Sequence, residues 1–174
     1  MRVLVVYESM FGNTEAIARA VADGLSGRMD VELHEVAKAS VSEGVDLIVA
    51  GGPTHAFSLS RPSTREDAIA QGAARGKESI GVREWLGHLP RATKVESFAA
   101  FDTRIDKVRR LPGSAAAKAA RIARRLGYAS AGHESFYVSD TAGPLVHGEL
   151  ERARTWGVLL AAQVSDQATE QTRG

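Results

Sequence analysis

Short apolar runs alternate with segments of helical periodicity along the chain. Apolar runs bounded by turn-forming residues predict strands at Val3–Tyr7, Val31–Val36, Val45–Gly51, Lys94–Phe101 and Glu134–Ser139. Helical patterns between such runs are typical of a parallel sheet that helices cover on both faces, with right-handed crossover connections. The pattern predicts an α/β fold, a three-layer sandwich around a five-stranded parallel sheet.

Three segments have the periodicity of long helices. The apolar stripe of the first consists of Ile17, Ala18, Val21, Ala22 and Leu25. The stripe of the second consists of Ala115, Ala119, Ile122 and Leu126. Ser114 is expected to cap this second helix and Gly127 to end it. A last helix is expected from His147 to about Val164, before a polar tail at 165–174 that we expect to be flexible.

The segment Ala56–Pro90 differs from the rest of the chain. It is rich in glycine and charge and contains few large apolar residues. We expect a long loop with short helices at Thr64–Arg75 and Gly81–Leu89. Long connections are more often functional than short ones, because a few residues suffice to join a strand to a helix.

Composition limits the chemistry that the chain can perform. Its 174 residues are 44% hydrophobic and 25% charged, which suits one globular domain, placed here at 1–164. Because no cysteine is present, disulfides, thiolate metal sites, iron–sulfur clusters and cysteine nucleophiles are excluded, so redox chemistry needs a cofactor. Neither a membrane span nor a signal peptide is evident, so we expect a cytoplasmic protein without membrane insertion.

The loop Glu8–Thr14 lies where the first strand meets the first helix. Unpaired N–H groups and the helix dipole favour an anion there, Ser9, Asn13 and Thr14 add donors, and Gly12 allows a tight curl. The loop has no Lys or Arg and no GxGxxG pattern, which favours a single terminal phosphate over a triphosphate or a dinucleotide. Alternatively, Ser9 or Asn13 only caps the helix.

The sequence resembles the flavodoxin family. The resemblance rests on "YESMFGNTEAIA", "IVAGGPTHAF", "FAAFDTR" and "SFYVSDTAGPLVHGELERARTWG", and it covers about residues 2 to 164. It implies a sheet of order 2-1-3-4-5 that carries flavin mononucleotide (FMN) across the carboxyl ends of its strands. Since no insertion splits the last strand, the chain is similar to the short-chain branch.

The resemblance also implies which residues hold the cofactor. Those for the phosphate are Ser9, Met10, Phe11, Gly12, Asn13 and Thr14. Those for one side of the flavin ring are Pro53, Thr54, His55, Ala56 and Phe57. Those for the other side are Phe101, Asp102, Thr103 and Arg104. His55 is also a candidate proton relay near the flavin.

Positive charge is concentrated in one span although the net charge is only +1. The span contains Arg104, Lys107, Arg109, Arg110, Lys118, Arg121, Arg124 and Arg125, opposed by Asp106 alone. Such a cluster favours an acidic protein, a nucleotide 2′-phosphate or another anion, or else it is a solvated helix face. No aromatic residues are interleaved with these charges, which disfavours nucleic acid. The histidines show no metal-ligand spacing, so we predict no metal site.

Three functions are compatible with the sequence. The first is an FMN-binding redox protein that transfers electrons between partners, such as a redox partner protein or an NAD(P)H-dependent reductase. The second is an FMN-dependent oxidoreductase of the NAD(P)H:quinone type or one that acts on a porphyrinogen. The third is a flavin-free module that binds phosphate or another anion on the same fold.

Overall fold

The computed structural model describes residues 1–41, 43–77, 79–93 and 96–173. Its central parallel sheet contains β1 (Arg2–Tyr7), β2 (Asp30–Glu35), β3 (Leu47–His55), β5 (Ser97–Ile105) and β6 (Ala129–Val138). The strand order is β2-β1-β3-β5-β6, which is the predicted order 2-1-3-4-5. A short strand that the sequence pattern did not reveal, β4 (Ser58–Leu59), pairs antiparallel with the end of β3.

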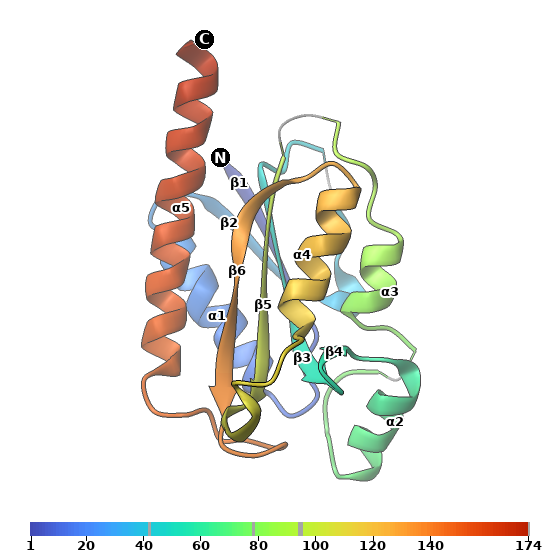
Figure 1. Ribbon diagram of the computed structural model, residues 1–174. Coiled ribbons are helices and arrows are strands. Elements are labelled where there is room, and N and C mark those ends of the chain that lie inside the picture. Colours follow the sequence, from blue (N-terminus) through green and yellow to red (C-terminus); the bar gives the residue numbers. More distant parts are fainter. Residues whose placement is uncertain (42, 78, 94–95, 174) are drawn as a thin grey trace.

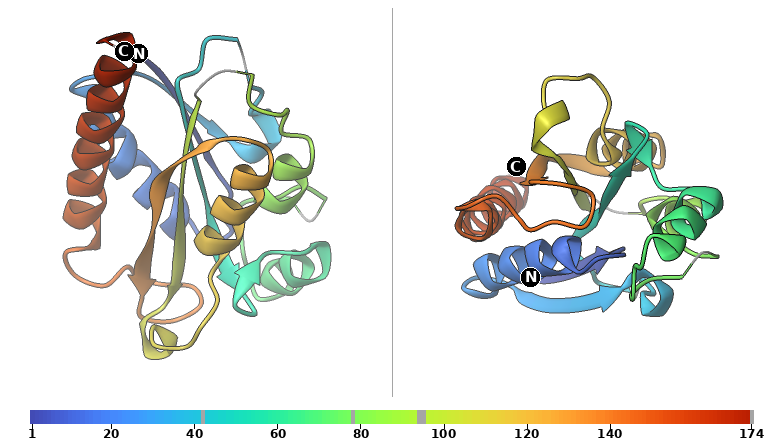
Figure 2. Two further views of the ribbon diagram at one scale, coloured as in Figure 1. Left: turned by 45° about the horizontal axis from the view of Figure 1, so that its top comes forward. Right: turned by 90° about the horizontal axis from the view of Figure 1, so that it is seen from below.

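Helices cover both faces of this sheet (Figures 1 and 2). One face carries α1 (Asn13–Ser26) and α5 (Glu149–Arg173), and the other carries α3 (Val82–Gly87) and α4 (Ala115–Arg125). The helix α2 (Pro62–Ala70) lies beside the carboxyl end of β3. Two 3₁₀ turns, Val36–Lys38 and Asp106–Val108, follow β2 and β5. The predicted three-layer arrangement is confirmed.

Several elements differ in length from the prediction. The strand β3 continues to His55 because it pairs with β4, and β5 continues to Ile105 because it pairs with β6 over that whole length. Lys94 and Val95, where the fourth strand was expected to begin, lie outside the described residues. The helix α2 ends at Ala70 instead of Arg75, since Gly72 follows with a φ of 92°.

The ends of α4 and α5 can be compared with the predicted ones. Ser114 caps α4 as expected, because its Oγ accepts a hydrogen bond from Ala117 N at 3.1 Å. Gly127, with a φ of 97°, follows the end of this helix. The helix α5 runs on to Arg173, beyond the expected end at Val164. No helix in the described ranges is long and apolar enough to cross a membrane.

Each face of the sheet buries its own apolar cluster. The side that faces α1 and α5 includes Val5, Ile17 and Phe101, and the opposite side includes Phe98 and Trp85. The helices α1 and α5 approach closely at two glycines. A Cβ on Gly24 would overlap the carbonyl oxygen of Arg154, and a Cβ on Gly157 would overlap that of Val21. This close contact fixes α1 against α5.

Candidate functional site

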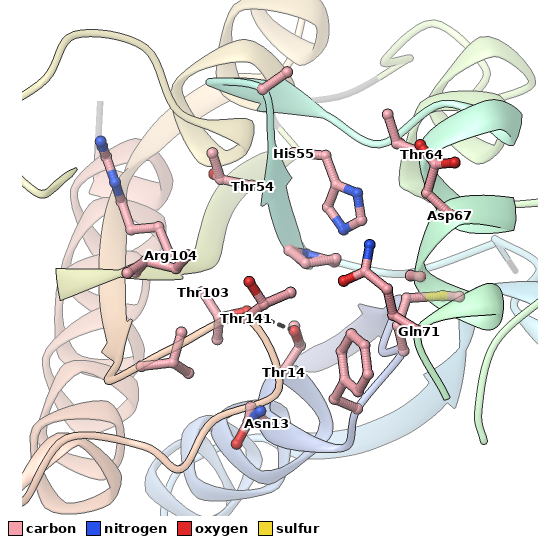
Figure 3. A pocket seen from close by; sticks show the side chains of 17 residues that line it. Asn13, Thr14, Thr54, His55, Thr64, Asp67, Gln71, Thr103, Arg104 and Thr141 are labelled. Atoms are coloured by element: carbon pink, nitrogen blue, oxygen red, sulfur yellow. Dashed lines mark hydrogen bonds between the residues drawn. The ribbon is translucent and has the colours of Figure 1, made fainter. Parts of the chain in front are cut away.

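A cavity of about 280 Å³ opens at the carboxyl ends of the strands (Figure 3). Its lining consists of Met10, Phe11, Asn13, Thr14, Pro53, Thr54, His55, Ala56, Thr64, Asp67, Ala68, Gln71, Thr103, Arg104, Ile105, Val138 and Thr141. These residues come from the loop before α1 and the first turn of that helix, from the ends of β3, β5 and β6 and the segment after β6, and from α2 and the residue that follows it. The cavity therefore lies where the strand order reverses, which is the usual ligand position in an open α/β sheet.

The loop before α1 keeps a set of backbone donors open. Gly12, with a φ of 91°, donates its N–H to Ser9 Oγ at 3.1 Å, and its carbonyl accepts the first helical bond from Ala16. The other amides of this turn, those of residues 10, 11, 13, 14 and 15, donate to no acceptor in the described part of the chain. Because these donors converge at the positive end of the α1 dipole, the turn is suited to bind an anion.

The first amides of α4, which lie close to the same edge of the sheet, differ from those before α1 because they are hydrogen-bonded to side chains. Ala115 N donates to Thr54 Oγ1 at 2.9 Å, and Ala116 N donates to Asp102 Oδ2 at 2.9 Å. With Ala117 N bonded to Ser114 Oγ, the first three amides of α4 all have side-chain acceptors. The fold thus satisfies one helix start internally and leaves the start of α1 open for a ligand.

Side-chain hydrogen bonds join the walls of the cavity. The hydroxyls of Thr14 and Thr103 lie 2.7 Å apart, as the dashed line in Figure 3 shows, and connect the start of α1 to the end of β5. Asn13 Nδ2 donates to the carbonyl oxygen of Ala142 at 3.0 Å. This second bond brings the segment after β6 to the cavity, where Val138 and Thr141 contribute to the lining.

The second predicted loop is a tight hairpin turn between β3 and β4. Ala56 and Phe57 have φ values of 47° and 61°, a left-handed conformation that is costly for residues with a side chain. Pro53, Thr54, His55 and Ala56 line the cavity as expected. Phe57 does not, because the turn directs its ring outward, where 46% of the residue is exposed. Phe57 is thus not among the residues that line this cavity, and its predicted place beside the flavin ring stays a prediction.

The third predicted group, residues 101–104, lies within β5, and only part of it reaches the cavity. Thr103 and Arg104 line the cavity, whereas Phe101 and Asp102 are buried before the strand ends. Phe101 packs edge-on against Phe136 and Trp156, at centroid distances of 6.2 and 6.3 Å. Asp102 faces the start of α4. Phe101 and Asp102 therefore do not line this cavity, and their predicted contact with the flavin ring stays a prediction.

Ser9 and Gly12 shape the first loop without lining the cavity. Ser9 is 3% exposed, and its hydroxyl is already bonded to the Gly12 amide. Their contribution is therefore to the backbone conformation that leaves the neighbouring amides open.

One wall of the cavity comes from the segment Ala56–Pro90, whose individual lining residues were not predicted from the sequence. Thr64, Asp67, Ala68 and Gln71 line it from α2 and the residue that follows the helix. Their spacing of three, four and seven residues is that of one helical face, so the signal was present in the sequence. In Figure 3 the Gln71 amide and the His55 ring point toward one another across the cavity.

A buried ionic cluster fixes this wall in place. Arg65 is fully buried and donates from Nη1 to Ser60 Oγ at 2.8 Å, and its Nη2 lies 3.0 Å from Glu84 Oε2. Glu8, at the end of β1, accepts a hydrogen bond from Val82 N at 2.9 Å, and burial raises the pKa of its carboxyl. The cluster connects β1, α2 and α3, so the position of α2 is set by the sheet.

Comparisons with solved structures agree with this fold. A flavodoxin from the domain Archaea superposes with a TM-score of 0.63 and 18% identity, over 95% of this chain and 99% of that one. The Streptococcus pneumoniae TIGR4 flavodoxin superposes with a TM-score of 0.62 and 18% identity, over 94% of this chain and 99% of that one. This chain has the flavodoxin fold. A flavone reductase superposes with a TM-score of 0.62 and 17% identity, over 97% of this chain and 64% of that one. Neither a family model nor a curated protein matches the sequence.

Within this flavodoxin-like fold, His55 is the titratable ring that lines the cavity. Burial lowers its pKa below the ordinary value of 6.5, and the nearby Arg65 guanidinium acts in the same direction, while the Thr64 backbone and Asp67 oppose them. His55 is therefore neutral at pH 7.

The lowered pKa of His55 predicts a pH dependence of stability. The folded chain takes up this proton at lower pH than the unfolded chain, so the fold should lose stability as the pH falls below 6.5. Urea unfolding between pH 7.5 and 5 measures the loss, and His55→Gln should make it smaller. An unchanged profile for His55→Gln, or an NMR titration midpoint above 6.5, would contradict this account.

Proposed function

We propose that the chain binds FMN in this cavity and transfers electrons between redox partners. The observation that carries the proposal is the set of open amides before α1, which face a cavity at the switch point of the sheet. A phosphate monoester has the charge and the acceptor atoms that such a turn satisfies. When bound, the flavin supplies the redox chemistry that a chain without cysteine cannot provide itself.

The residues present fit the parts of this cofactor. The amides of residues 10, 11, 13, 14 and 15 would hold the phosphate. The ring would lie between Pro53–Ala56 on one side and Thr103 and Arg104 on the other, with the α2 face along its edge. Among the lining residues only Phe11 and His55 are aromatic, so stacking on the ring is limited.

A titration of the purified apo-protein tests the proposal. Addition of FMN should give saturable one-to-one binding, with quenched flavin fluorescence and a shifted absorption band. A redox partner protein or an NAD(P)H-dependent reductase should then reduce the bound flavin. Protein that ignores FMN while binding inorganic phosphate would favour the flavin-free anion module instead.

Arg75 should strengthen binding of the phosphate. Its Nε lies 3.7 Å from the position that a Cβ on Gly12 would occupy, and its guanidinium pairs with Glu15 in the first turn of α1. The cation absent from the loop itself is thus supplied by a distant segment. We expect Arg75→Gln to weaken FMN binding severalfold without changing the affinity for riboflavin, because riboflavin has no phosphate.

Arg19 provides the matched control for Arg75. It also pairs with Glu15, at 2.7 Å, but it is one turn along the helix from this carboxylate. Arg19→Gln should therefore weaken FMN binding less than Arg75→Gln does. Equal effects of the two substitutions would show that Arg75 acts only by neutralising Glu15.

A second function, an FMN-dependent oxidoreductase for a planar substrate, is favoured by the α2 wall. Asp67, Gln71 and His55 place polar groups along the cavity, where they can hydrogen-bond a substrate that lies over the ring. Steady turnover of NAD(P)H with a quinone or a porphyrinogen, in the absence of another protein, would support this function over electron transfer between proteins.

A further inference from the structure

A second depression lies outside the central cavity, around the start of α4. It consists of two adjoining hollows of about 320 and 230 Å³ that share Gly113, Ser114 and Ala117. The first hollow also includes Arg104, Arg109, His133, Glu134, Ser135 and Tyr137, and the second includes Phe57, Ser58, Lys118 and Arg121. We call the two hollows together the α4 groove.

The α4 groove contains a cation that the fold holds in a fixed position. Arg104 is only 6% exposed, and its Nη2 donates to the carbonyl oxygens of Val108 and Leu111 at 2.9 and 3.0 Å. Its buried Nε has no partner among the described residues. Arg104 lines both the α4 groove and the central cavity, so the two are adjacent. A positively charged guanidinium held in a fixed position at the wall of a groove favours an anionic ligand.

Charges around this guanidinium leave the groove positive. Glu134 lines it, but its carboxylate pairs with Arg152 at 3.0 Å. Asp106 pairs with Arg109 at 3.3 Å in an exposed position, where such a pair contributes little. Asp102 is buried and accepts a hydrogen bond from the α4 backbone. Arg104, Lys118 and Arg121 form no ion pair within the described part of the chain, so their positive charges contribute to the electrostatic potential of the groove.

The other end of the groove presents an aromatic ring. Phe57 occupies the outward position of the strained β3–β4 turn, with a φ of 61° and 46% of the residue exposed. The turn abuts the start of α4, since a Cβ on Gly113 would lie 2.7 Å from the Phe57 carbonyl oxygen. Ser58 and Ser135 add hydroxyls along the groove. Lys118 and Arg121 line the hollow that contains this ring, and Arg104 and Arg109 line the other. The ring and the two arginines of the other hollow match the base and the phosphate of a nucleotide.

We propose that the α4 groove binds a nucleotide that carries a phosphate monoester. Its base lies on Phe57, and its phosphate lies beside Arg104 and Arg109. An acidic protein is a poorer match, because the Arg104 guanidinium is recessed below the surface and a small ligand reaches it more readily. The central cavity is adjacent through Arg104, so a nucleotide here would lie next to a bound flavin. This last point rests on the proposed function, whereas nucleotide binding itself does not.

Calorimetric titration of the apo-protein tests the proposal with 2′,5′-ADP, 5′-AMP and inorganic phosphate as probes. We expect saturable binding of 2′,5′-ADP that weakens at least fivefold in Arg109→Gln and in Phe57→Ala. The exposed Arg28, on the turn after α1, gives the control Arg28→Gln, which should bind as the parent chain does. Because 2′,5′-ADP carries both phosphates, binding of 2′,5′-ADP without binding of 5′-AMP would identify the 2′-phosphate as the group that is recognised, and equal affinities for the two would identify the 5′-phosphate.

Three outcomes would overturn the proposal. The first is the absence of saturable nucleotide binding, and the second is binding that neither Arg109→Gln nor Phe57→Ala weakens. The third is competition between FMN and 2′,5′-ADP, which would place the nucleotide in the central cavity. Because FMN affinity is measured on the same samples, a failure of the groove is distinguishable from a failure of FMN binding.

Discussion

Gly51→Ala is expected to lower the free energy of unfolding by about 3 kcal/mol. A Cβ on Gly51 would overlap the end of the Phe101 ring, which is 1% exposed. The ring has no free space into which it can move, because Phe136 and Trp156 pack edge-on against it. Urea unfolding followed by circular dichroism gives the change directly.

Two further variants test the reason for this effect. Gly27→Ala adds the same methyl group where nothing lies within 4 Å and where φ is −66°, so its stability should be unchanged or slightly higher. Phe101→Leu replaces the ring with a shorter side chain that lacks the overlapping atoms, so the double variant with Gly51→Ala should be more stable than the sum of the single effects predicts. Strict additivity would show that the overlap is not the cause.

Phe11→Asp is expected to weaken FMN binding at least tenfold relative to Phe11→Asn. Phe11 lines the cavity within the loop before α1, so either substitution removes the same ring from the same place. Only the aspartate adds a negative charge beside the amides that would hold the phosphate. The carboxylate repels the dianion and competes for the same donors.

Titrations at different ionic strengths, and titrations with riboflavin in place of FMN, show whether the difference between the two variants is caused by charge. The difference between the two variants should shrink as ionic strength rises, because salt screens the repulsion. It should also be much smaller for riboflavin than for FMN. If the aspartate and asparagine variants bind FMN equally well, the phosphate does not lie at the start of α1.

The order of elements was predictable because it depends on local patterns. Apolar runs, the Ser114 cap and the glycine after α4 each reflect preferences of a few neighbouring residues. The ends of β3 and β5 were not predictable in this way, since pairing with β4 and β6 extends both strands. Because of this extension, Phe101 and Asp102, which the pattern placed at the end of a strand, lie within β5 and are buried.

The candidate site was predictable where one loop forms it and less so where distant segments meet. The contribution of residues 10–14 was predictable because one junction between a strand and a helix contains them all. The contribution of Arg75 depends on how the segment after α2 returns over that junction. Arg65 is fully buried although a charge in a glycine-rich segment favours exposure, because Ser60 and Glu84 satisfy it only in the folded chain.

The central claim is that open amides at the start of α1 bind a phosphate monoester. Parallel fluorescence titrations of the apo-protein with FMN and riboflavin test it most directly, because the two ligands differ only in the phosphate. We predict that FMN binds at least tenfold more tightly and that inorganic phosphate competes with FMN but not with riboflavin. Equal affinities for the two ligands, or binding of neither, would contradict the claim.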